Sequence, residues 1–133
     1  MPVTAAEYSA LAGFRSALRR FLHFSAAAAG AAGLAPAQHQ ALLAIKAFGG
    51  VPGMAVGELA DRLDRRPNST VGLVDRLVRR RLVRRVADPA DRRRVRVRLT
   101  AAGERLLGTL SAAHRDELRR LGPELRRLLR RLG

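Results

Sequence analysis

The hydrophobic pattern predicts helices at both ends of the chain. Near the N-terminus, apolar residues recur at steps of three and four, which is the spacing of one face of an amphipathic helix: Leu11, Phe14, Leu18, Phe21 and Leu22. We expect this helix to run from about residue 4 into the alanine-rich stretch AAAAGAAG (26–33). Towards the C-terminus, the pattern predicts a long helix capped by Thr100, a break at Gly122-Pro123, and a last short leucine-rich helix.

The middle of the chain predicts three shorter helices followed by a hairpin. One helix opens with Pro36 and stops at GGVPG (49–53), a second covers 56–63, and a third runs from 67 or 68 to Arg80. Two strands, 83–87 and 93–99, are joined by the turn DPAD (88–91). A helix, a short turn, a second helix and a hairpin form the order of a winged helix-turn-helix.

These elements predict a mainly α fold with a small β-hairpin wing. We expect a single domain over 1–133, with a DNA-binding lobe at 34–99 and a helical dimerisation region made of 4–33 and 100–133. The leucines of the C-terminal helices need a partner, for which the N-terminal helix is the obvious candidate, but the domain alone is too small to cover all of them. We therefore expect them to pair with those of a second copy.

Charge narrows the choice of partner. The chain has 26 basic and 11 acidic side chains, a net charge of +15, and all but one of the basic residues are arginines. Fourteen arginines and only four aspartates lie between residues 62 and 98, so the excess is concentrated on the predicted lobe. A polyanion such as double-stranded DNA is the expected partner.

The helix ending at Arg80 has the composition of a DNA-reading element. On a helical wheel Thr70, Leu73, Val74 and Leu77 share the core face, and short polar groups and arginines gather on the opposite face. Asn and Arg can contact base edges in pairs of hydrogen bonds, and Ser and Thr can reach bases or phosphates. The free amides at the helix start favour a phosphate. The predicted DNA-binding residues, those of the wing included, are Asn68, Ser69, Thr70, Gly72, Arg76, Arg79, Asp91, Arg92, Arg93, Arg94 and Arg96.

In the second predicted strand, apolar residues alternate with arginines. Val95, Val97 and Leu99 should face the core, and Arg94, Arg96 and Arg98 should form a cationic face towards the DNA backbone.

Four segments resemble the MarR family of bacterial transcription regulators: ELADRL (58–63), TVGLVDRL (70–77), LVRR (82–85) and DPADRRRVRVRLTAAG (88–103). The resemblance runs from about residue 34 to 110. It implies a homodimer whose N- and C-terminal helices intertwine, with two lobes on a pseudo-palindromic operator, most simply as a repressor. It also implies that 68–79 enters the major groove and that Arg93 enters the minor groove, oriented by a salt bridge from Asp91.

The chain departs from the family pattern at two positions. Arg81 stands where relatives usually have a glycine that closes the recognition helix in a left-handed conformation. A residue other than glycine there is expected either to cost around 1 kcal/mol or to shift the helix end. Gly72 stands where relatives often have a polar residue, which puts base readout there in doubt.

Many relatives release DNA when a small phenolic or anionic ligand binds between the dimerisation helices and the lobe. The residues available for such a pocket are Phe14, Phe21, His23, Phe24 and His39, although aromatic residues at helical spacing also serve as core. No cysteine is present and the three histidines are scattered, so we expect no metal and no cofactor. No catalytic motif is present, which argues against an enzyme.

Two other readings stay open. An architectural protein would use the arginines only to neutralise phosphate. A membrane-surface protein would use the C-terminal helix, where Arg126, Arg127, Arg130 and Arg131 alternate with leucines. The N-terminus lacks the pattern of a signal peptide and no stretch is apolar enough to cross a membrane, so we expect a cytoplasmic protein and no membrane partner.

Overall fold

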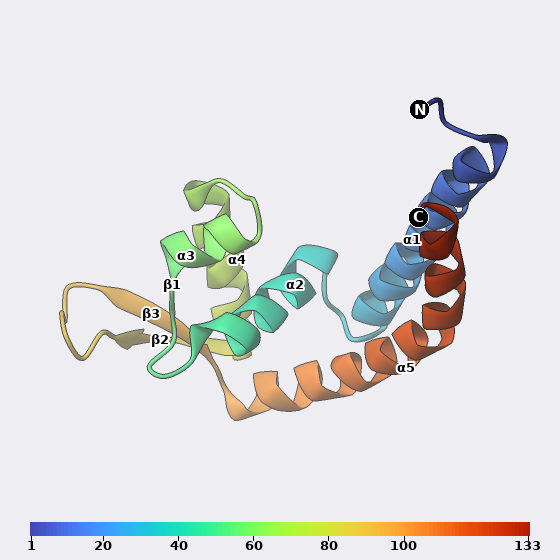
Figure 1. The fold of residues 1–133 in the computed structure, drawn as a ribbon. Helices are drawn as coiled ribbons and strands as arrows, with labels where there is room; N and C mark the ends of the chain where they lie inside the picture. The colour runs from blue at the N-terminus through green and yellow to red at the C-terminus, as the bar shows by residue number, and fades with distance from the viewer. The chain divides into compact units, whose positions relative to one another are not determined.

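The computed structural model describes residues 1–133, which divide into two compact units (Figure 1). One unit is formed by 29–109, and the other by 1–28 together with 110–133. The long terminal helices α1 (Ala5–Ala31) and α5 (Ala101–Arg131) each contribute residues to both units.

The unit formed by 29–109 is a winged helix-turn-helix, as predicted. It contains α2 (Pro36–Ala44), α3 (Val56–Arg62) and α4 (Pro67–Arg79), followed by the wing strands β2 (Val83–Ala87) and β3 (Val95–Leu99). Each of these elements contributes buried aliphatic side chains to the core of the unit: Leu42, Leu59, Leu73, Val74, Leu77, Val83 and Val97. The predicted core face of the helix before the wing is therefore confirmed.

The sheet has a third strand that the hydrophobic pattern does not predict. Strand β1 (Met54–Ala55) pairs with β3 in antiparallel register, so the strand order is β1-β3-β2. The turn before it is closed at Gly53, which has φ +139°, and a Cβ there would lie 2.6 Å from the carbonyl oxygen of Val97. Only glycine fits this approach of the backbone to β3.

The wing differs from the predicted hairpin at its tip. Strand β3 begins at Val95 rather than at Arg93, because the amide of Arg94 donates to the carbonyl of Asp91 within the turn (2.9 Å). Val97 and Leu99 pack inward as predicted, but Val95 is 45% exposed. The inward face of β3 therefore anchors only the half of the wing that lies near the core.

Helix α4 ends in a Schellman motif built on Arg81. The amide of Arg81 donates to the carbonyl of Val78 (2.9 Å), and the amide of Leu82 donates to that of Leu77 (3.1 Å). Arg81 itself has φ +59°. The left-handed helix end expected at this position is therefore formed, with an arginine where glycine would be unstrained.

Helix α5 begins against the same corner of the lobe. The hydroxyl of Thr100 accepts the amide of Gly103 (3.0 Å), which confirms Thr100 as the N-cap, and donates to the carbonyl of Arg81 (2.6 Å). A Cβ on Gly103 would lie 2.0 Å from the carbonyl oxygen of Leu82. The first turn of α5 thus packs directly on the backbone that follows α4.

In the second unit, the N-terminal helix packs against the last third of the chain. Leu128 lies over Gly13, so closely that a Cβ added to Gly13 would lie 2.8 Å from Cδ2 of Leu128. Arg20 forms an ion pair with Glu124 (2.7 Å). His114 bonds the hydroxyl of Ser25 through Nε2 (2.8 Å). No helix of the structure is both long and apolar enough to cross a bilayer.

The predicted break at Gly122-Pro123 is wrong. Helix α5 continues through Pro123 to Arg131, and its ribbon changes direction in its C-terminal part (Figure 1). Proline removes one backbone hydrogen bond and bends a helix, but Gly122 has no Cβ to clash with the proline ring. On either side of the proline α5 contacts α1, through His114 with Ser25 before it and through Glu124 with Arg20 after it.

Candidate nucleic-acid interface

Helix α4 presents a polar and cationic face to solvent. Asn68, Ser69, Arg76 and Arg79 are exposed and Gly72 is partly exposed, all on the side opposite the buried Leu73 and Leu77. The arginines stand towards the C-terminal end of the helix, and the short polar groups stand at its start. This is the distribution predicted from the helical wheel.

Thr70 does not belong to this face, and its prediction as a DNA-binding residue does not agree with the structure. Its side chain is fully buried, and its hydroxyl donates to the carbonyl of Arg66 (2.9 Å). Thr70 closes the first turn of α4 from the core side, which agrees with its place beside Leu73 on the wheel.

The start of α4 leaves backbone donors unused. Arg66 occupies the N-cap and offers no side-chain acceptor, and Pro67 at the first helical position has no N–H. Ser69 turns its hydroxyl towards the carbonyl of Arg66 (3.0 Å) rather than towards an amide. The free amides of this turn, together with the positive end of the helix dipole, favour an anion such as a DNA phosphate.

The space around Gly72 does not require glycine. A Cβ built there would meet only Nη1 of Arg76, at 3.8 Å, which is an ordinary contact. Packing inside the lobe therefore does not explain why glycine stands at position 72, where it lowers the stability of the helix by about 1 kcal/mol relative to alanine.

An ion pair fixes the orientation of α4 relative to the wing. Asp75, on the side of the helix, pairs with Arg85 of β2. Arg85 lies opposite Val97 in the sheet register and so belongs to the face that packs towards the helix. Two elements that would contact DNA are thereby held in one relative geometry.

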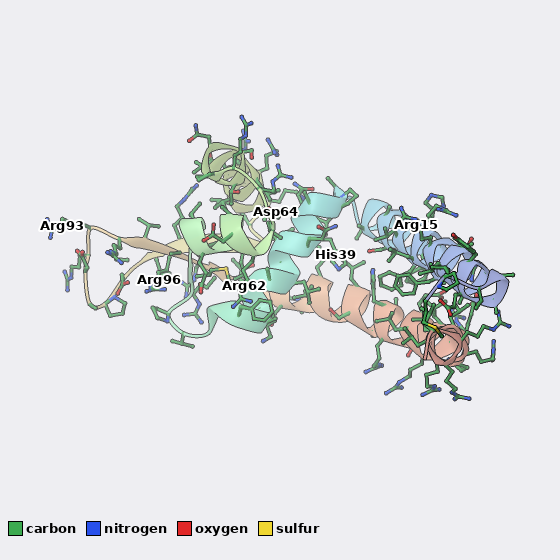
Figure 2. The ribbon with its side chains drawn as sticks, turned by 45° about the horizontal axis from the view of Figure 1, so that its top comes forward. Arg15, His39, Arg62, Asp64, Arg93 and Arg96 are labelled. Carbon is green, nitrogen blue, oxygen red and sulfur yellow. The ribbon has the colours of Figure 1, made fainter.

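The wing tip carries three exposed arginines, Arg92, Arg93 and Arg94. Figure 2 shows Arg93 at the end of the hairpin. Asp91 accepts the Arg93 amide (3.1 Å) and lies 3.4 Å from its Nε, so the predicted Asp91–Arg93 ion pair is present. The side chain of Arg93 is nonetheless 94% exposed. Asp91 orients Arg93 and leaves most of its guanidinium free for a partner.

Arg96 has a different role from the one predicted. Its Nε donates to Oδ2 of Asp88 (2.8 Å) and its Nη1 donates to the carbonyl of Gly53 (3.2 Å), so it joins the wing turn to the loop before β1. Arg96 therefore acts as a brace at the base of the turn, and its contact with DNA stays a prediction.

Asp88 is the buried partner in this brace. Its carboxylate accepts the amide of Ala90 (2.8 Å) as well as Arg96. These two hydrogen bonds hold the pKa of Asp88 below its usual value of 3.8, and the hydrogen bond from Ala90 has the larger effect. Sequence reasoning placed Asp88 only in the turn, because nothing in the local pattern shows that the strand register brings Arg96 to it.

Two of the residues expected around an effector line the same groove. Phe14 and Phe21 line an apolar groove of about 220 Å³ between α1 and the C-terminal part of α5. Phe24 instead makes an edge-on contact with His114, whose ring is 5.3 Å away. His23 is exposed, and His39 is buried within the other unit.

Three leucines of α5 line this groove opposite the N-terminal helix, which is the partner predicted for them, and His114 adds a polar contact that was not predicted from the sequence. Leu118, Leu121 and Leu125 line the groove with the two phenylalanines, and His114 is held between Phe21, Phe24 and Ser25. The helical spacing of the leucines indicated an apolar face in need of a partner, whereas no local pattern shows that His114 meets Phe21, Phe24 and Ser25.

Comparisons with known proteins agree with this geometry. Residues 32–94 match the model of the MarR family. The uncharacterized HTH-type transcriptional regulator YsmB of Bacillus subtilis is 39% identical over 66 residues, which are 50% of this chain and 45% of YsmB. The matched region thus spans less than half of that relative's length.

Two solved structures resemble the whole chain. A probable transcriptional regulator from Pseudomonas aeruginosa is 34% identical, with a TM-score of 0.66 over 90% of this chain and 93% of that one. A mutant of Staphylococcus aureus MepR bound to an oligodeoxyribonucleotide is 21% identical, with a TM-score of 0.74 over 95% of this chain and 98% of that one, and shows a shared fold.

Proposed function

We propose that the chain is a DNA-binding transcriptional regulator of the MarR family, and that it is a repressor that binds a pseudo-palindromic operator as a homodimer. The observation that carries the proposal is the exposed face of α4, where Asn68, Ser69, Arg76 and Arg79 stand together beside a wing with a free Arg93. Asn and Arg are the residues best suited to reading base edges in the major groove.

The wing supplies a second contact in this proposal. Arg93 would enter the minor groove next to the half-site, and Arg92 and Arg94 would neutralise the phosphates on either side. The free amides at the start of α4 would hold one further phosphate. Backbone contacts of this kind position the lobe, and α4 supplies the sequence preference.

The homodimer is supported by apolar side chains that the helical unit leaves in solvent. Tyr8 is 64% exposed, Leu22 51% and Leu129 58%, and all three belong to α1 or to the C-terminal part of α5. Large apolar residues gathered on one unit of a small protein mark an interaction surface. Two-fold pairing of this surface would give the two lobes that a pseudo-palindrome requires.

A small phenolic or anionic effector that releases the DNA is a further part of the proposal. The groove lined by Phe14, Phe21 and their leucine neighbours is large enough for an aromatic ring and has an apolar wall. Phe14 and Phe21 belong to the set of residues predicted for the effector pocket from the sequence.

Selection of bound DNA from a random pool at physiological salt tests the proposal. We expect one enriched sequence with two inverted half-sites, bound on the order of 10³-fold more tightly than random DNA. A preference ratio near one over a salt titration would instead show an architectural protein, whose arginines only neutralise phosphate.

The Gly72→Ala variant makes the test specific to α4. The substitution removes a glycine from a helix interior and fits without a clash, so it should stabilise the fold by about 1 kcal/mol. If the backbone at Gly72 approaches DNA closely, the same variant should bind the selected operator more weakly. Operator binding that is unchanged or tighter would show that this stretch of α4 is not in the groove.

A further inference from the structure

The base of the wing holds two arginines that no other group of the protein neutralises. Arg84 of β2 and Arg98 of β3 are directly opposed in the antiparallel register. Both lie on the face of the sheet opposite the buried Val83 and Val97. Neither guanidinium makes a hydrogen bond or an ion pair.

This pair is unusual among the cations of the sheet and its surroundings. Arg85 pairs with Asp75, Arg96 with Asp88, and Lys46 with Glu104. Like charges directly opposed across an antiparallel pair destabilise a sheet. Arg98 is also partly buried, which adds a desolvation cost that nothing in the lobe offsets.

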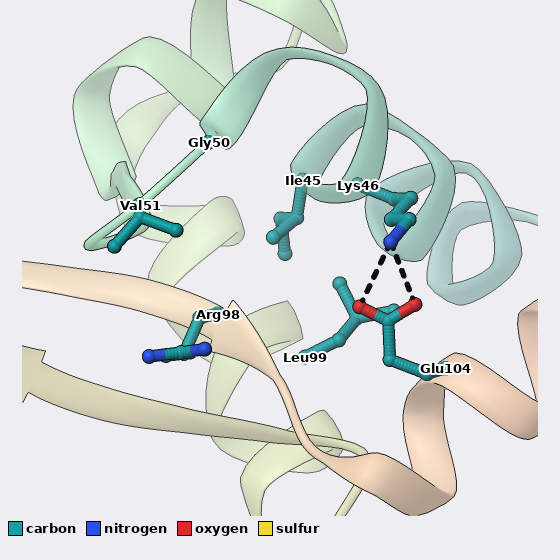
Figure 3. Close-up of a pocket in the computed structure, with 7 residues that line it drawn as sticks. All are labelled: Ile45, Lys46, Gly50, Val51, Arg98, Leu99 and Glu104. Carbon is teal, nitrogen blue, oxygen red and sulfur yellow. Dashed lines mark hydrogen bonds and ion pairs between the residues drawn. The ribbon is translucent and has the colours of Figure 1, made fainter.

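The two arginines line hollows that adjoin each other. One hollow, of about 180 Å³, is bounded by Ile45, Lys46, Gly50, Val51, Arg98, Leu99 and Glu104 (Figure 3). The second, of about 420 Å³, shares Arg98, Leu99 and Glu104 and adds Arg84 and the first residues of α5. Figure 3 shows Glu104 turned to Lys46, with Arg98 on the other side of Leu99 beneath Val51.

The lining has the charge and shape of a site for a dianion. Lys46, Arg84 and Arg98 face one carboxylate, Glu104, which leaves two positive charges in excess. Ile45, Val51 and Leu99 form an apolar wall beside them. Two guanidinium groups provide paired donors for the oxygens of a phosphoryl group, and the wall suits a small organic substituent.

We propose that the base of the wing binds a small phosphate monoester through Arg84 and Arg98, with its organic group against Ile45, Val51 and Leu99. The ligand would supply the negative charge that the fold lacks there. The inference rests on the lobe alone, so it stands or falls separately from operator binding.

Calorimetric titration with phenyl phosphate at fixed ionic strength tests the site. We expect saturable one-to-one binding per chain, and a dissociation constant at least about tenfold larger in the variant Arg84→Gln/Arg98→Gln, because each guanidinium provides charge-assisted hydrogen bonds. The variant Arg105→Gln/Arg119→Gln loses the same charge from exposed positions outside both hollows and should bind as the parent does. Equal weakening in both variants would show diffuse attraction and overturn the proposal.

A second measurement separates a free phosphate ester from the phosphates of DNA. If Arg84 and Arg98 contact DNA instead, replacing each of them should reduce the slope of log K for DNA binding against log salt concentration by about one. We expect an unchanged salt dependence. Without ligand, Arg84→Gln alone should raise the melting temperature, since it removes the repulsion from Arg98. A lower melting temperature would contradict the inference that Arg84 and Arg98 repel each other in the absence of a ligand.

Discussion

Two residues with side chains end helices of the lobe in the left-handed conformation. Asp64 follows α3 with φ +52°, and Arg81 follows α4 with φ +59°. Asp tolerates this region better than most residues because its short side chain can bond locally, whereas Arg gains nothing there. The strain is therefore concentrated at the end of the helix proposed to read DNA.

Replacing Arg81 with glycine should stabilise the protein. We expect the Arg81→Gly variant to raise the free energy of unfolding by about 1 kcal/mol, because glycine adopts the left-handed conformation without a Cβ clash. Denaturant unfolding of the two proteins measures the difference. Asp64→Gly serves as the matched control and should give a smaller gain; a loss of stability in Arg81→Gly would show that the Arg81 side chain supports the fold.

Residue-level prediction from the sequence succeeded where the chemistry is local. Thr100 as N-cap and the Asp91–Arg93 pair both involve neighbours in sequence. The pairs Asp88–Arg96 and Asp75–Arg85 were missed, because they depend on strand register and on how α4 packs against β2. Arginines that look equivalent in the alternating stretch therefore differ in role: Arg96 is a brace, Arg98 lines a hollow and Arg94 is exposed.

At the scale of elements, the wing is stabilised by a buried carboxylate whose contribution depends on pH. The pKa of Asp88 is lower in the folded protein, so the ion pair and the Ala90 hydrogen bond stabilise the fold above the usual value of 3.8. This contribution is lost as the pH falls through the folded pKa, when Asp88 takes up a proton.

The variant Asp88→Asn should expose this dependence. At neutral pH we expect it to unfold at a lower denaturant concentration than the parent, and the gap should close as the pH is taken below 3.8. Asp61→Asn, at an exposed position of α3 without a side-chain partner, should show no such convergence. A gap for Asp88→Asn that stays constant into acid would mean that the carboxylate charge is not the stabilising feature.

The elements that the pattern predicted well are those with a clear period and local end signals. Helices α3 and α4 and strand β2 lie where expected, within a residue or two. The helix that opens at Pro36 ends as α2 at Ala44 and continues as a π-helix, η1 (Ile45–Gly49), up to the predicted stop. Strand β1 is two residues long and has no period to detect, and it exists because Gly53 lets the chain approach β3. The continuity of α5 through Pro123 is set by packing against α1, which outweighs a local signal for a break.

At the scale of the whole molecule, the exposed apolar residues of the helical unit predict that the protein forms a homodimer. We expect the parent protein to sediment as a dimer at micromolar concentration, and the variant Leu22→Glu/Leu129→Glu to sediment as a monomer, because charged side chains would be buried in the interface. The control Arg15→Glu/Arg126→Glu alters charge at other exposed positions of the same helices and should stay dimeric. A monomeric parent would rule out the dimer and leave one lobe per binding unit.

The brace between Asp88 and Arg96 also bears on how the wing would recognise its target. It fixes the strands up to the turn, while Arg93 beyond it is held only by the exposed Asp91. A guanidinium that can adjust its position, carried on a rigid arm, is suited to sensing the width of the minor groove and its negative potential rather than the identity of a base. Such a reader favours A-tracts, where the groove is narrow. The operator should therefore show its flanking preference as DNA shape, at base pairs that no side chain contacts.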